Sequence, residues 1–182
     1  MSRMMAAALA LATAGCMTGG VTRAGDAPTG LGASAEIGDA SGVAKAIAGL
    51  IPERGRVRVE INAGGLAPGT YGVHIHTTGR CDPPGFVSAG GHWNPTARQH
   101  GAQNPQGRHL GDLPNLQVDP RGKGRLIFHV ENARLEGGAN PLLDADGAAI
   151  VIHAQPDDHR TDPSGNSGAR IACGVIHKGN NH

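Results

Sequence analysis

Apolar and polar residues alternate over several short stretches of the chain, and this alternation predicts β-strands. The clearest case begins at Arg56, where Val57, Val59 and Ile61 share one face and charged residues take the other. Comparable runs rich in Val, Ile and Ala separate turn-forming residues elsewhere; they cover 33–50, 71–76, 115–132, 148–154 and 170–176. We therefore expect an all-β domain of about eight strands, a Greek-key β-barrel or sandwich.

Two long segments, 77–114 and 155–169, interrupt this pattern and are rich in Gly, Pro, Asn and His. A long segment without strands in a compact domain is usually functional or pinned to its surroundings. The chain has 182 residues with 30 glycines and 12 prolines, which disfavours long helices, and only 2% aromatic residues. We therefore expect one domain, residues 33–182, which has a core of small aliphatic side chains and two long functional loops.

The first residues are typical of an export signal rather than of the fold. Arg3 precedes an apolar run that is too short to span a bilayer, and small residues then lead to Cys16. Residues 1–15 resemble a bacterial lipoprotein signal, after which an acylated Cys16 and a flexible linker, 16–32, would tether the domain. We expect a periplasmic protein, lipid-anchored to the outer membrane; ordinary cleavage giving a soluble periplasmic product is the alternative. Net charge is +1 with scattered basic residues, which gives no sign of a nucleic-acid surface.

The cysteine count agrees with export. The chain has three cysteines, and acylation of Cys16 leaves the pair Cys81 and Cys173. In an oxidising compartment we expect these two to form a disulfide, the alternative being two buried thiols.

His74 and His76 lie two residues apart on one predicted strand, so their imidazoles point to the same face. Two surface histidines would give this pattern, but paired neutral imidazoles also suit copper or zinc. His153 ends another apolar strand. Together with one histidine from the long loop, these would form a four-nitrogen set suited to Cu(II).

The long loop carries a second candidate set. His92, His100 and His109 occur at intervals of eight and nine residues, and Asp112 follows three residues later. Three imidazoles and one carboxylate make a complete tetrahedral zinc set. Such a site would cross-link the loop and supply folding free energy that burial alone does not provide.

Several short motifs occur along the chain in the same order as in a known protein family. They are GVHIH, SAGGHWNP, HG at 100–101, RHLGD, VIHAQPDD and GNSGARIACGVI. In these the sequence resembles the copper–zinc superoxide dismutases over residues 33–176. The resemblance implies an enzyme that converts superoxide to dioxygen and hydrogen peroxide, with one copper and one zinc per subunit.

The resemblance also implies individual roles. Copper would be held by His74, His76, His92 and His153. Zinc would be held by His92, His100, His109 and Asp112, so that His92 bridges both metals. Asp157 would orient His74 and His100, and Arg170 would attract the anion beside the copper. Cys81 and Cys173 match the family disulfide, and Asp158 is expected to be structural.

Four other histidines are not assigned to a metal. His129 should point to solvent, and His159, His177 and His182 fall in a loop or the tail. A non-catalytic periplasmic copper carrier on the same fold is the alternative function; it predicts a missing ligand or arginine, and neither is missing. Superoxide is the expected substrate, membrane contact would come only through the lipid, and the sequence leaves a homodimer open.

Overall fold

The computed structural model describes residues 32–179, which form ten β-strands and one short 3-10 helix. In chain order these are β1 (Ala33–Asp39), β2 (Ala44–Glu53), β3 (Arg56–Gly64), β4 (Gly69–Tyr71), β5 (Val73–His76), η1 (Val87–Ala89), β6 (Leu116–Val118), β7 (Lys123–Glu131), β8 (Ala149–His153), β9 (Arg170–Val175) and β10 (His177–Lys178). The predicted signal, Cys16 and His182 lie outside the described residues. No helix within residues 32–179 is long and apolar enough to cross a membrane.

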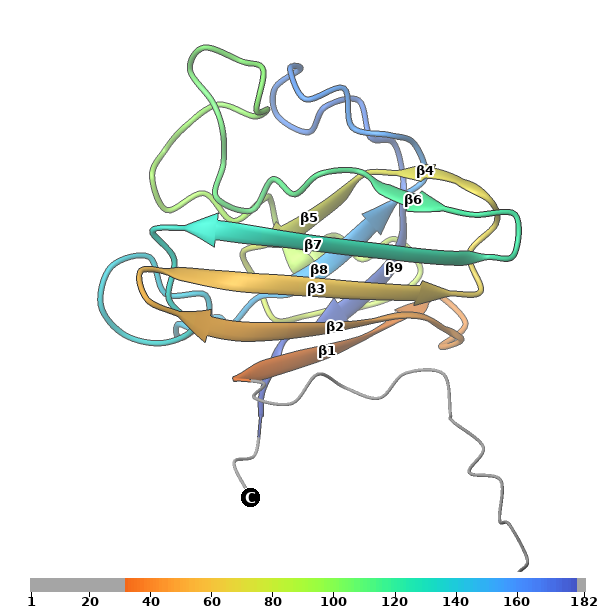
Figure 1. Cartoon of the computed structure of the whole chain (residues 1–182), viewed down its shortest axis with the longest axis horizontal. Helices are drawn as coiled ribbons and strands as arrows, with labels where there is room; N and C mark the ends of the chain where they lie inside the picture. Colours follow the sequence, from red (N-terminus) through yellow and green to blue (C-terminus); the bar gives the residue numbers. More distant parts are fainter. Residues whose placement is uncertain (1–31, 180–182) are drawn as a thin grey trace, which may run out of the picture.

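All the strands belong to one antiparallel sheet in the order β4-β6-β7-β3-β2-β1-β9-β8-β5, with β10 beside β1 (Figure 1). The sheet curls so that β5, β8 and β9 lie behind β3 and β7. Gly72 brings its two ends together, since it donates its N–H to Gln155 O at 2.9 Å and accepts the N–H of His153 at 2.9 Å. The prediction of an all-β barrel is confirmed.

The strand count is higher than expected for two local reasons. Gly72 divides the predicted 71–76 strand into β4, which pairs with β6, and β5, which pairs with β8. In addition, His177 and Lys178 form a short strand beside β1.

The alternation in β3 is confirmed on its apolar face, where Val57, Val59 and Ile61 are fully buried. Full burial of such side chains contributes about 1.5–3 kcal/mol each. Glu60 departs from the pattern, because it lies on the polar face yet is only 5% exposed. Arg58 pairs with its carboxylate, and Arg125 on the neighbouring β7 approaches it to 3.8 Å. The alternating pattern predicts an exposed Glu60, but the side chains of Arg58 and Arg125 cover its carboxylate.

The main core consists mostly of Val, Ile, Leu and Ala, as the scarcity of aromatic residues predicts. Trp93 is the buried aromatic residue of this cluster. A smaller cluster surrounds Phe86 and includes Ala149, Val151 and Cys173. Phe86 belongs to the first long loop, so this cluster packs the loop against β8 and β9.

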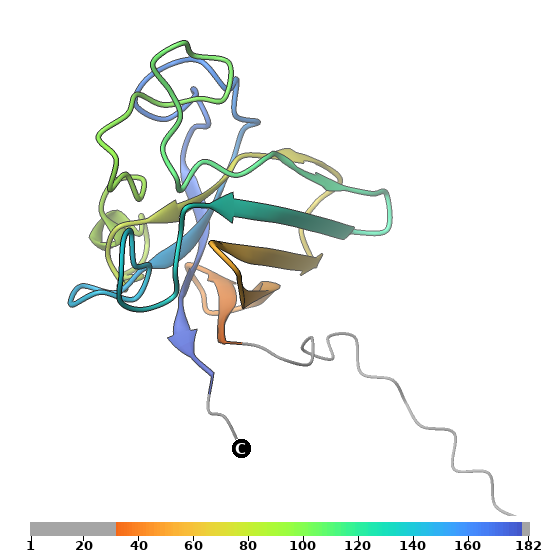
Figure 2. The same cartoon turned by 60° about the vertical axis from the view of Figure 1, so that its left-hand side comes forward.

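The two loops expected at 77–114 and 155–169 are observed at 77–115 and 154–169, and they rise from the same end of the barrel (Figures 1 and 2). They lie side by side in both views and meet through a hydrogen bond of 2.9 Å from the N–H of Gln103 to His159 O. Loops that are far apart in sequence are thus brought together over β5 and β8.

Candidate metal centre

Strands β5 and β8 position three of the predicted histidines. His74 and His76 share one face of β5 and are both fully buried, while Val73 and Ile75 on the other face belong to the main core. His153 ends β8, which pairs antiparallel with β5. Both faces of β5 are therefore inside the protein, and the alternative of two surface histidines is wrong.

The first loop covers the outer edge of β5 and brings its own ligands there. Ile75 donates its N–H to Gly111 O at 2.9 Å and accepts that of Trp93 at 2.7 Å. The loop consequently places His92 opposite His76, and Asp112 opposite His74, as paired residues. Gly111 has to be glycine, since a Cβ there would lie 2.4 Å from the Ile75 carbonyl oxygen.

Four histidines gather their nitrogens into one group. The ligand atoms of His74, His76, His92 and His153 all lie within 4.8 Å of one another. The outer nitrogen of each strand-borne ring is hydrogen-bonded: His74 Nε2 to Asp157 Oδ2 at 2.8 Å, His76 Nδ1 to Gly90 O at 2.9 Å and His153 Nδ1 to Gly168 O at 3.2 Å. These bonds fix each ring and point its second nitrogen inward.

The inward nitrogens have no hydrogen-bond partner. Among the described residues, the buried side-chain atoms without a partner are His74 Nδ1, His76 Nε2, His100 Nδ1 and His153 Nε2. Leaving such an atom unsatisfied costs on the order of 1–3 kcal/mol. All four belong to predicted ligands, so the donor set fits a metal ion.

Asp112 is the centre of the second group. Its Oδ1 lies 2.9 Å from His92 Nδ1 and 3.1 Å from the Nδ1 atoms of both His100 and His109. Three nitrogens around one carboxylate oxygen have the composition of a tetrahedral zinc site. A ligand atom of His74 also lies within 4.8 Å of ligand atoms of His92, His100 and Asp112. His74 comes this close because its ring stacks on His92 at a centroid distance of 3.8 Å.

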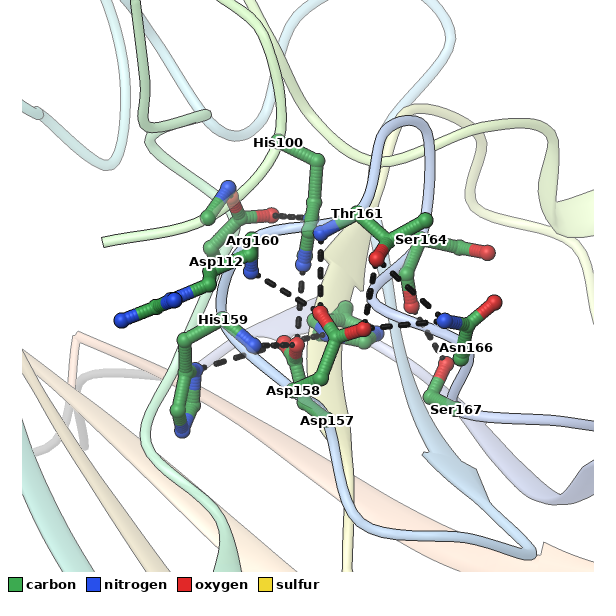
Figure 3. Close-up of polar contacts among 12 residues, drawn as sticks. His100, Asp112, Asp157, Asp158, His159, Arg160, Thr161, Ser164, Asn166 and Ser167 are labelled. Atoms are coloured by element: carbon green, nitrogen blue, oxygen red, sulfur yellow. Dashed lines mark hydrogen bonds and ion pairs between the residues drawn. The ribbon is translucent and has the colours of Figure 1, made fainter. Parts of the chain in front are cut away.

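Asp157 connects the two groups from behind, as expected. Its Oδ2 accepts from His74 Nε2 at 2.8 Å, and its Oδ1 contacts His100 Nε2 at 3.0 Å (Figure 3). Gly165 makes room for this carboxylate, because a Cβ there would lie 1.8 Å from Asp157 Oδ1. Orientation of imidazoles by a carboxylate of this kind is typical of metal sites.

Burial keeps the strand-borne imidazoles neutral. It lowers the pKa of His74 to about 3, against the opposing effect of Asp157, and that of His153 to about 4. Burial also lowers the pKa of His92. Neutral rings have the free lone pair that a metal requires.

His100 differs from the strand-borne rings. Burial opposes its protonation, but the neighbouring carboxylates of Asp112 and Asp157 outweigh burial and raise the pKa of His100 to about 9. Burial likewise opposes ionisation of the two carboxyls, yet their histidine partners hold the pKa of Asp112 and of Asp157 well below the usual range. A metal bound at His100 Nδ1 therefore replaces a proton.

Arg170 begins β9 directly beside the four-histidine group. It pairs with His153 in the β8–β9 register, and its guanidinium donates to Phe86 O at 2.7 Å and Gly90 O at 2.6 Å. Gly90 O therefore accepts hydrogen bonds from both Arg170 and His76. Burial lowers the pKa of Arg170.

The disulfide between Cys81 and Cys173 is confirmed, with Cα atoms 5.7 Å apart and a sequence separation of 92 residues. It ties the start of the first loop to β9. Asp158 holds its own loop, as expected, by accepting hydrogen bonds from Arg160, Thr161 and Asn166 (Figure 3).

The structure adds two residues that sequence reasoning left without a role. Asn115 pairs with the backbone of Asp157, accepting its N–H at 2.8 Å and donating to its carbonyl at 2.9 Å. His159 donates its N–H to Asp157 Oδ1 at 2.6 Å. Neither residue stands in a periodic pattern, so the only sequence signal was proximity to the predicted ligands.

Of the unassigned histidines within residues 32–179, His159 contacts Asp157, whereas His129 and His177 lie on strands β7 and β10. His129 is half-exposed on β7, 3.6 Å from Glu53 Oε2, and His177 is exposed on β10.

The chain is similar to known proteins in sequence and in fold. The family model for copper/zinc superoxide dismutase matches residues 44–176. The chain is 43% identical over 148 residues to copper–zinc superoxide dismutase 2 of Aquifex aeolicus (strain VF5), covering 80% of this chain and 86% of the relative. It is 49% identical over 125 residues to a superoxide dismutase-like protein of Bacillus subtilis (strain 168), covering 68% of this chain and 63% of the relative. A crystal structure of a superoxide dismutase-like protein from Bacillus subtilis superimposes with a TM-score of 0.74 at 41% identity, over 78% of this chain and 96% of that one.

Proposed function

The chain belongs to the copper/zinc superoxide dismutase family, and from this premise we propose how its residues divide between copper, zinc and substrate. It is an enzyme that converts two superoxide anions and two protons into dioxygen and hydrogen peroxide. Copper, when bound, supplies the one-electron oxidation and reduction, while zinc has a structural and tuning role.

We assign copper to the four-histidine group: His74, His76, His92 and His153. The observation that carries this assignment is the set of inward-facing ring nitrogens without hydrogen-bond partners, whose opposite nitrogens are all fixed. Four imidazole nitrogens are a donor set that suits Cu(II).

We assign zinc to His92, His100, His109 and Asp112. The convergence of three Nδ1 atoms on Asp112 Oδ1 supports this set, including His109 rather than His74. His74 Nδ1 is then left for copper. His92 presents Nδ1 to Asp112, which leaves Nε2 for the four-histidine group, so His92 would be a ligand of both metals.

The chain's own residues have two tasks in the reaction. Arg170 attracts and orients the superoxide anion, since its guanidinium is held beside His76 and His153 by two backbone carbonyls. His92 Nε2, which would hold copper in one half of the cycle, would hold a proton in the other half and pass it to the reduced product. Positioned proton transfer of this kind contributes roughly 10²–10⁴-fold to a rate.

The copper-carrier alternative is not favoured. It predicts that a ligand or the arginine is missing, whereas the described residues include every predicted ligand together with Arg170. Metal analysis combined with a superoxide-decay assay tests the choice. One copper and one zinc per chain with fast decay agree with the enzyme, and bound copper without activity would favour the carrier.

The proposal extends to the location of the protein. Supported by the lipoprotein-like signal and the disulfide, we place it in the periplasm, anchored to the outer membrane through acylated Cys16. Mass spectrometry of the mature protein tests this, because an intact signal or a start beyond Cys16 would contradict it. Sedimentation of the metal-loaded protein distinguishes a monomer from the homodimer that the proposal allows.

A further inference from the structure

The second loop, residues 154–169, packs directly on the zinc-binding loop. Gln103 donates its N–H to His159 O at 2.9 Å and accepts the Nε–H of Arg160 at 2.8 Å. The backbones touch at Gly101, where a Cβ would lie 2.3 Å from His159 O. Figures 1 and 2 show the two loops together at this end of the barrel. The geometry of the zinc-binding loop therefore depends on its neighbour.

Besides Asp157, Asp162 is a second acidic residue of this loop that faces the proposed zinc ligands. Its Oδ1 accepts the backbone N–H of His100 at 2.6 Å. The same oxygen lies 4.0 Å from His109 Nε2. One carboxylate oxygen thus faces two ligands that are nine residues apart on the loop.

His109 is the proposed ligand that otherwise lacks an outer partner. Metal-bound histidines usually donate their second ring N–H to a carboxylate, a carbonyl or water. His74 and His100 have Asp157 in this role, whereas His76 and His153 have backbone carbonyls. Within residues 32–179, Asp162 is the acidic residue whose carboxylate lies within 4.0 Å of His109 Nε2.

We propose that Asp162 is a positioning residue of the zinc site, which fixes the main chain at His100 and attracts the outer N–H of His109. This inference rests on the proposed zinc assignment. At 4.0 Å the contact with His109 is longer than a direct hydrogen bond, so it acts through charge or a bridging water. Loss of outer partners of this type typically weakens metal binding by about 10–100-fold.

The test compares zinc affinity in Asp162→Ala, Asp162→Asn and the matched control Asp158→Ala. Asp158 belongs to the same loop, but its carboxylate accepts hydrogen bonds from loop residues 160–166 (Figure 3). The folded, copper-loaded proteins are titrated with zinc against a chromophoric chelator, and the visible spectrum of Co²⁺ bound in place of zinc is recorded.

We expect Asp162→Ala to weaken zinc binding by at least about tenfold and to shift the Co²⁺ bands. The copper affinity should stay within about threefold of the parent's, because Asp162 contacts His100 and His109 but none of the proposed copper ligands. Asp162→Asn keeps an oxygen that accepts the His100 N–H, so its zinc affinity should lie between those of the parent and Asp162→Ala. If Asp162→Ala does not fold, Asp162→Asn alone tests the proposal.

Two results would overturn the role of Asp162: unchanged zinc affinity and Co²⁺ spectrum in both variants, or an equal loss in Asp158→Ala, which would show a general effect of loop integrity. A parent protein that binds copper but no zinc would instead refute the zinc assignment itself, and the inference with it.

Discussion

The strand-borne and loop-borne ligands are positioned in different ways. His74, His76 and His153 lie on β5 and β8, where the ladder of backbone hydrogen bonds sets their spacing. His100, His109 and Asp112 lie on a loop without regular structure of its own and depend on contacts with β5, Asp157 and the second loop. The strand half of the centre is therefore built by the barrel, and the loop half by contacts between distant segments.

This difference indicates where metal binding and folding are coupled. A loop of this length loses considerable chain entropy when it is ordered. The disulfide and the loop–loop hydrogen bonds offset part of that cost, and metal coordination supplies more. The loop half should thus respond to the loss of cross-links, whereas the strand half should persist.

The largest expected effect comes from removing the disulfide with Cys81→Ala and Cys173→Ala together. The chain-entropy estimate for its 92-residue separation is about 4 kcal/mol of unfolding free energy, roughly a thousandfold in the folding equilibrium. Denaturant titration measures the loss, and hydrogen exchange locates it. Faster exchange should be concentrated in residues 77–115; equal acceleration in β2 and β3 would break the distinction between the two halves.

The second test is His92→Ala, which removes the residue shared by the strand half and the loop half of the metal centre. We expect a folded protein whose dismutation rate falls by about a hundredfold or more, the lower range for a positioned proton-transfer group. The optical spectrum of the bridged copper should be lost as well. His129→Ala, on the outer face of β7, is the control and should keep the parent's rate. Parental spectra and activity in His92→Ala would refute the shared-ligand assignment.

Arg170→Ile tests a strand-borne residue that is held by loop carbonyls. Because superoxide is small and anionic, its capture is electrostatic, and the rate should fall by about tenfold, at the low end of electrostatic steering. Both metals should remain bound. The remaining rate should decline less steeply with salt, since screening has less attraction to remove.

Arg121→Ile is the matched control for this charge change, because Arg121 is exposed in the turn between β6 and β7. It should leave both rate and salt dependence unchanged. If Arg170→Ile also behaves like the parent, Arg160 becomes the candidate for guiding the anion.

The smallest effect is expected at Asp39, the last residue of β1, whose carboxylate contacts Ser41, Val43 and Lys45. Ser41 and Lys45 hold the pKa of Asp39 well below its usual range. A depressed pKa in the folded state stabilises the protein above the unfolded value, near 4, and this contribution is lost as the pH falls. Asp39→Asn should therefore lower the midpoint of urea unfolding slightly at pH 7, with a difference that shrinks toward pH 2. A difference that grows on acidification would contradict the assignment.

Local patterns were sufficient to predict the strand half of the centre. Alternation identified β3 and placed His74 and His76 on one face, since period-two geometry depends only on neighbouring residues. The ligands of the loop half were found from their spacing and from resemblance. Contacts such as Asn115 with Asp157, or Asp162 with His100, join segments 42 and 62 residues apart. No periodicity encodes contacts of this kind, and the burial of Glu60 likewise depends on Arg125 of a neighbouring strand.

The loop segments beside β5 also close an edge of the sheet. They accept the N–H groups of Ile75 and Thr77 and donate to the carbonyls of Val73 and Ile75. An uncovered strand edge of this kind is a template for pairing with another chain and hence for aggregation. A loop that lifts away exposes that template. Resistance to aggregation and retention of the ligands are therefore properties of the same stretch of polypeptide.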